Sequence, residues 1–198
     1  MALTSPAYSQ ETAKEPIDDI ADIIAWKSIQ GAVVSRDGQW FAYYLTPQEG
    51  NGELIIRETE GDKEFRFPIG ETPRYFSNAL YFSHDSKWAA WTVFPTRQES
   101  RQAEKQKKPA HNNISLLNLN SGDKRDFEDI KAFSFSGENP GWLALHSYPG
   151  EDQSKGDEKW KGSDLMLLDL NGPQQLNFGN VSEFSFDKKG DWLVWIVD

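Results

Sequence analysis

The sequence of 198 residues contains no cysteine and only three histidines. The lack of cysteine excludes disulfide bonds and thiolate chemistry within these residues, but it does not define the cellular compartment. His84, His111 and His146 are widely separated, so metal-ligand spacing is absent, and no EF-hand pattern supports calcium. The G-x-S-x-G, P-loop and H-E-x-x-H motifs are also absent. We therefore predict no catalytic, cofactor-binding or metal-binding residue.

The chain also has little positive charge and no long apolar run. Its formal net charge is -10, which argues against a nucleic-acid surface because acidic proteins repel phosphate backbones. No apolar stretch approaches the ~18 residues of a membrane-spanning helix. Aromatic residues, by contrast, make up 13% of the chain. We expect an aromatic-rich β protein without nucleic-acid or membrane partners.

An aromatic strand that follows a polar turn occurs four times. Trp40, Trp88, Trp142 and Trp192 mark the copies, at spacings of 48, 54 and 50 residues. We expect all four to occupy equivalent positions near the start of the second strand of successive blades, largely buried between sheets. A period near 50 residues is typical of propeller blades rather than of sandwich strands. The apolar run in each copy is nearly unbroken, so both faces of the strand must be covered. A blade stacked between two neighbouring blades meets that requirement.

A second unit, made of a strand, a turn and another strand, lies between consecutive copies. Its turns contain Gly61, Gly122 and Gly172. We expect these glycines to take positive φ in hairpins, because apolar runs flank the turns on at least one side. Each period therefore holds two hairpins, or four strands.

These patterns predict an all-β fold, a partial β-propeller of about three four-stranded blades plus the first half of a fourth. The expected blades span residues 33–67, 78–127, 132–178 and 183–198, within an incomplete propeller domain of residues 17–198. A closed ring of seven or eight blades would need roughly 350 to 400 residues. We therefore interpret the chain as the N-terminal part of a longer protein. The strand edges left open in this fragment predict that it self-associates.

The N-terminal residues leave two interpretations open. Residues 1–16 are either a disordered tail or a signal-peptide remnant, since residues 1–10 resemble the end of a secretory signal without its charged and apolar regions. A signal remnant would indicate a periplasmic or secreted protein. Residues 17–26 have isoleucines at helical spacing and two aspartates in the first turn, so we expect a short N-terminal helix there.

Two polar segments, residues 96–113 and 149–162, interrupt the repeat. Residues 97–108 contain no glycine, proline or β-branched residue, so we expect a helix there. Both segments should project from one rim of the propeller. Charged runs of this kind are usually solvated surfaces, and the alternative is a lip that controls access or a docking site for another domain.

Ser83, His84 and Asp85 place the residue types of a serine-hydrolase triad side by side. Consecutive residues point in different directions, however, and a working triad is assembled from separated positions. Ser35 and Asp37 occupy the equivalent places in the first copy. We therefore interpret the segment as a turn in which serine and aspartate side chains bond nearby backbone.

The S-x-D-G-x-W turn before an aliphatic-aromatic strand, and the later strand ending in LNLNSGDK, resemble a known family. They are similar to the N-terminal propeller of prolyl oligopeptidase-family serine peptidases. Residues 23–35, the Lys-rich residues 105–109 and residues 161–167 look like the large secreted bacterial members in particular. The resemblance covers nearly the whole chain after about residue 17, although S-x-D-G turns also occur in TolB-like propellers.

The resemblance implies a propeller that gates peptide access to a C-terminal α/β-hydrolase domain, where the nucleophilic serine and its aspartate and histidine would lie. None of those positions exists in this chain, so peptide substrates would be bound through the missing domain. The alternative is a non-enzymatic TolB-like scaffold that binds protein partners. An Asp-box glycosidase propeller is weaker, because the turn SRDGQW is too short and no carboxylate pair is identifiable.

Overall fold

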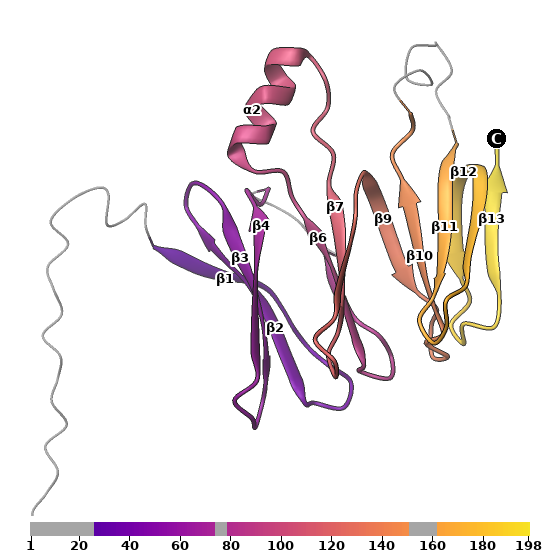
Figure 1. Cartoon of the computed structure of the whole chain (residues 1–198), viewed down its shortest axis with the longest axis horizontal. Helices are drawn as coiled ribbons and strands as arrows, with labels where there is room; N and C mark the ends of the chain where they lie inside the picture. The colour runs from indigo at the N-terminus through magenta and orange to yellow at the C-terminus, as the bar shows by residue number, and fades with distance from the viewer. Residues whose placement is uncertain (1–25, 74–78, 151–161) are drawn as a thin grey trace, which may run out of the picture.

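The computed structural model describes residues 26–73, 79–150 and 162–198. Three antiparallel sheets follow one another along the chain and stand side by side (Figure 1). The expected N-terminal tail and almost all of the expected N-terminal helix lie outside the described residues, as does most of the second polar segment. Within the described residues, no helix is long and apolar enough to cross a membrane. The succession of sheets confirms the all-β, partial-propeller fold.

The first sheet contains four strands in sequence order: β1 (Lys27–Val34), β2 (Trp40–Pro47), β3 (Gly52–Glu58) and β4 (Glu64–Gly70). It begins before residue 33, where the first blade was expected. Along β2, buried residues alternate with half-buried ones and none is exposed. This pattern is expected for a strand that is covered on both faces.

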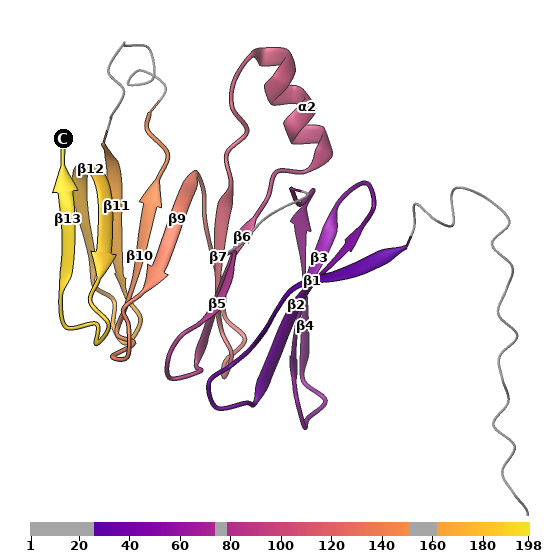
Figure 2. The same cartoon turned by 180° about the vertical axis from the view of Figure 1, so that it is seen from behind.

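The second sheet repeats that order with β5 (Leu80–Phe82), β6 (Trp88–Val93), β7 (Asn113–Asn118) and β8 (Lys124–Phe127). The helix α2 (Arg97–Gln106) connects β6 to β7. It stands above the strand ends, on the rim away from the turns that join the first two strands of each sheet (Figure 2). The sheet matches the blade expected at residues 78–127.

Helix α2 confirms the helix expected within residues 97–108. Thr96 caps its N-terminus, because the Thr96 hydroxyl accepts a hydrogen bond from the Glu99 N–H at 3.2 Å. The Glu99 carboxylate accepts one from the Thr96 N–H at 2.7 Å, which completes a capping box. Lys107 ends the helix in the left-handed conformation. None of the helical residues is buried, so local capping rather than core packing fixes this helix.

The third sheet has five strands rather than four. They are β9 (Ile130–Phe135), β10 (Trp142–Ser147), β11 (Ser163–Asp169), β12 (Gln175–Phe186) and β13 (Leu193–Val197). The first half of β12 pairs with β11, and its second half pairs with β13. β12 therefore ends the third repeat and begins the fourth.

The half-blade expected at residues 183–198 is thus not a separate sheet. Between the third and fourth repeats, residues 179–182 contain no proline that would end pairing. Asn180 takes a φ of 61°, and the register shifts beside Val181 in both pairings. A bulge of this kind bends the strand without interrupting it, so β13 joins the third sheet instead of starting its own.

The four repeat tryptophans occupy equivalent positions, as the sequence predicted. In each copy the backbone N–H of the tryptophan donates to the side chain that opens the preceding turn, over 2.9 to 3.0 Å. The acceptor is a serine hydroxyl in the first three copies and the Asp187 carboxylate in the fourth. One short polar interaction therefore sets the start of every tryptophan strand.

The sheets pack through two distinct faces, and we call the face that carries the repeat tryptophan the forward face. The forward side chains of the first sheet, including Trp40 and Ala42, pack against Ala89 and Trp91 of the second sheet. The forward face of the second sheet, which carries Ala90, packs in the same way on the third sheet. The second half of β12 and β13 cover part of the forward face of the third sheet.

Burial of the tryptophans follows this stacking and corrects the expectation that all four are largely buried. Trp40 is 6% exposed, Trp88 and Trp142 are half-buried, and Trp192 is 75% exposed. Trp192 lies just before β13, on the forward side, which no further sheet covers in the described residues. Equivalent position in the repeat therefore does not give equivalent burial.

The hairpin glycines also differ from the expectation. Gly122 has a φ of 81°, but Gly61 and Gly172 do not take positive φ. At these two positions a β-carbon would collide with the carboxylates of Glu58 and Asp169. Glycine therefore leaves room for an acidic side chain to fold over the turn, and the backbone conformation does not itself require it.

Candidate functional site

Ser83 and Asp85 form a turn rather than a catalytic group, which confirms the sequence interpretation. The Ser83 hydroxyl donates to the Asp85 carboxylate at 2.6 Å and accepts from the Trp88 N–H at 3.0 Å. Ser35 and Asp37 make the same bond at 2.6 Å in the first repeat. Both serine hydroxyls therefore serve to close the turn of their own repeat.

The structure brings together a buried Ser–His pair that the sequence did not indicate. Nε2 of His146 lies 2.8 Å from the Val181 carbonyl and 3.0 Å from the Ser163 hydroxyl. A carbonyl only accepts, so Nε2 carries the proton and cannot take one from Ser163. Ser163 itself donates to the Ser147 carbonyl at 2.7 Å. This pair joins β10, β11 and β12 and has no catalytic geometry.

We expect His146 to make the stability of the fold depend on pH. Burial lowers the pKa of His146 below its usual value near 6.5, and the charge of Lys131 acts in the same direction, while the bond to Val181 opposes them. The unfolded chain therefore binds the proton first as the pH falls below about 6.5, and the free energy of unfolding decreases.

Urea unfolding at pH 7.5 and 5.5 measures this decrease. His146→Gln removes the titrating group and keeps a side-chain donor, so its loss of stability between the two pH values should be smaller than in the unchanged chain. An equal loss in both proteins would contradict the assignment. His111→Gln is the control, because it makes the same change in a half-buried histidine at the rim, outside this buried pair.

A third histidine lies beside an acid at the rim. Nδ1 of His111 is 3.0 Å from the Asp129 carboxylate, and its ring stacks on Tyr148 with centroids 4.0 Å apart. The contact links the chain returning from α2 to the third sheet. In the ranges that the structure describes, no group of three or more His, Cys, Asp or Glu side chains is placed to hold a metal ion.

A series of adjoining cavities follows the first strands of the repeats. A cavity of about 460 Å³ lies between β1 and β5, and one of about 470 Å³ lies between β5 and β9. A third, of about 430 Å³, is lined by β9 and β12. Adjoining cavities share lining residues, so we treat them together as the first-strand trough. The two larger cavities share these residues: Arg36, Tyr81, Phe82 and His84.

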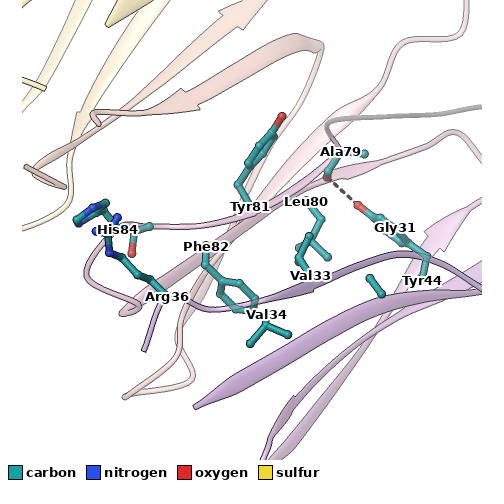
Figure 3. A pocket seen from close by; sticks show the side chains of 12 residues that line it. Gly31, Val33, Val34, Arg36, Tyr44, Ala79, Leu80, Tyr81, Phe82 and His84 are labelled. Atoms are coloured by element: carbon teal, nitrogen blue, oxygen red, sulfur yellow. Dashed lines mark hydrogen bonds between the residues drawn. The ribbon is translucent and has the colours of Figure 1, made fainter. Parts of the chain in front are cut away.

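The first part of the trough is shown in Figure 3. The buried Tyr44 hydroxyl donates to the Ala79 carbonyl at 2.7 Å, which holds β2 against the start of the second sheet. Burial raises the pKa of Tyr44 far above its ordinary value, so the phenol stays protonated and donates. At the other end of the view, the Arg36 side chain extends toward the His84 ring.

The sequence contains a signal for these residues, although no catalytic motif marks them. Arg36, His84, Gly137 and Lys188 each directly follow the side chain that opens the turn of their repeat. All four line the 470 Å³ cavity. Alignment of the four copies on that turn residue would have placed three basic side chains around one end of the trough.

Among known proteins, the fold of this chain is similar to solved propeller structures. No family model matches the sequence, and no curated protein matches it. Among solved structures, the β-propeller domain of the Trilobed protease from Pyrococcus furiosus matches 81% of this chain at 11% identity and a TM-score of 0.50. An acylaminoacyl peptidase in complex with Z-Gly-Gly-Phe-chloromethyl ketone matches 89% at 14% identity, with a TM-score of 0.52.

A structure from an analysis of two prolyl endopeptidases matches 86% of this chain at 14% identity and a TM-score of 0.54. These neighbours are propeller-containing peptidases of the prolyl oligopeptidase family. The chain spans 45%, 29% and 26% of the lengths of the three matched chains. At such low identity the likeness establishes a shared propeller fold.

Proposed function

We propose that this chain is the propeller segment of a prolyl oligopeptidase-like serine peptidase and controls the access of peptides to a hydrolase domain outside these residues. The observation that carries the proposal is the stacking of successive sheets in propeller order, together with the likeness to propeller domains of such peptidases. Fold alone does not choose a function, so the proposal also depends on the two surfaces that a gate would use.

Those surfaces are the first-strand trough and the rim that carries α2. The trough offers a concave, partly aromatic surface to a passing chain. On the rim, α2 covers a further cavity of about 450 Å³, lined by residues that include Glu99, Lys108 and His111. A solvated helix above a cavity at one mouth of a propeller is suited to limiting the size of what enters.

Peptide substrates are the partners that this proposal implies. A periplasmic or secreted location also belongs to it, and is motivated by residues 1–10, which lie outside the described residues. The coding sequence beyond Asp198 tests the peptidase assignment. Further blades followed by a nucleophile elbow would support it, whereas ring closure and a stop codon would support the scaffold alternative and overturn it.

Gating is tested in the complete protein by replacing residues 97–106 with a short Gly-Ser turn. We expect kcat/KM for a long peptide to rise severalfold relative to a dipeptide substrate, because the helix would no longer narrow the rim. The control is the same replacement in the exposed turn at residues 60–62, which should leave the ratio unchanged. An unchanged ratio without the helix would contradict gating by α2.

A further inference from the structure

We propose that the 470 Å³ cavity of the first-strand trough binds the free α-carboxylate of a peptide whose last residue is aromatic or large and apolar. Arg36 and His84 would receive the carboxylate, and Tyr81 and Phe133 would contact the last side chain. The choice of a peptide as ligand rests on the proposed function. The site itself rests on the charge, hydrogen bonding and aromatic lining of the cavity.

Arg36 supplies a positive charge that is not compensated inside the protein. Its side chain is exposed, and in the described part of the chain it has no hydrogen bond or ion pair. The neighbouring Asp37 is occupied, because its carboxylate accepts from the Ser35 hydroxyl at 2.6 Å and from the Gln39 N–H at 3.0 Å. An exposed guanidinium without an ionic partner is suited to a bidentate bond with a carboxylate.

His84 supplies a donor that lacks a partner. Its Nε2 atom is inaccessible to solvent and makes no hydrogen bond within the described residues. Buried polar atoms are nearly always bonded, so the unpaired Nε2 of His84 has bonding capacity left for a ligand. Nε2 is covered in the unliganded protein, so the ring must turn to bring this atom to the cavity surface. In the tautomer with a proton on Nε2, His84 can then donate to the second oxygen of the carboxylate that Arg36 binds. The two side chains come from adjacent repeats and line this cavity. They lie next to each other in the view of the neighbouring cavity (Figure 3).

Aromatic rings form the apolar part of the cavity. Tyr81 is 39% exposed and meets Phe133 edge to face, with centroids 5.7 Å apart. Phe82 and Phe135 also line the wall. An aromatic or large aliphatic side chain next to the carboxylate would bury its surface against these rings.

The charges of the cavity favour a single carboxylate over other ligands. Lys188 pairs with Glu138 at 3.5 Å, so these two charges largely cancel and Arg36 sets the net charge of the cavity. A peptide N-terminus would be repelled by the guanidinium. A polyanion would be repelled by the net charge of -10 on the chain.

Titration of the chain with N-acetyl-Gly-Gly-Phe and with its C-terminal amide, followed by calorimetry, tests the proposal. We expect the acid to bind at least about tenfold more tightly, because the amide loses the charge-assisted bonds. Arg36→Ala should remove most of that difference. The matched control is Arg57→Ala, an exposed arginine of β3 outside the trough, which removes the same charge and should leave the difference intact.

His84→Phe provides an independent readout. It should weaken binding of the acid without lowering the free energy of unfolding, since Nε2 has no partner in the unliganded protein. Equal binding of acid and amide, no binding of either at millimolar concentration, or equal effects of Arg36→Ala and Arg57→Ala would each overturn the site. The peptidase assignment is tested by the coding sequence beyond Asp198, and the site is tested by these binding measurements. Either one can therefore fail without the other.

Discussion

Trp91→Ala should lower the free energy of unfolding by about 3–5 kcal/mol, the usual cost of truncating a large, fully buried aromatic side chain. Trp91 is 0% exposed and lies between the first and second sheets, where it stacks on Phe67 with centroids 4.9 Å apart. Its indole nitrogen makes no hydrogen bond in the described residues, so the expected loss comes from packing alone. Urea unfolding at constant pH measures it.

Trp192→Ala is the matched control for this prediction. The same side chain is removed, but Trp192 is 75% exposed on a face without a covering sheet. Its removal should change the free energy of unfolding by no more than about 0.5 kcal/mol. Equal losses for the two variants would show that the sheets do not stack as described, because burial between sheets is what distinguishes the two sites.

The second large effect concerns self-association of the 198-residue chain through β13. Val194 and Ile196 on the forward face of this edge strand, and Trp192 just before it, are between 55% and 75% exposed. On its other face Leu193 is half-buried in the third core cluster, and Trp195 contacts Phe178 with ring centroids 4.5 Å apart. An apolar edge strand without lysine or proline is a template for pairing with another copy.

Sedimentation velocity should therefore show an average sedimentation coefficient that rises with protein concentration. The double substitution Val194→Lys and Ile196→Lys places charge on the exposed face and should weaken association at least tenfold. Ile29→Lys is the control, since Ile29 is 61% exposed on β1, in the first sheet. A monomer at all concentrations, or an equal effect of the control, would contradict association through this face.

The candidate site shows where prediction from sequence reached its limit. The turn interpretation of Ser83 and Asp85 was right because its hydrogen bonds join residues no more than five positions apart. The Ser163 and His146 pair was not predicted, since it depends on the register between β10 and β11. The trough was missed for a similar reason, because its lining comes from several repeats and no local motif marks it.

The sequence by itself determined the local units of this protein. Nearly unbroken apolar runs, turn serines and repeat tryptophans specified the strands, and a run of residues without helix breakers specified α2, because these patterns act over a few residues. Tertiary structure decided which tryptophans are buried, that β12 continues into the fourth repeat, and that Arg36 and His84 share a cavity. Burial and cavities depend on which surface covers another, and residues far apart in the chain supply those surfaces.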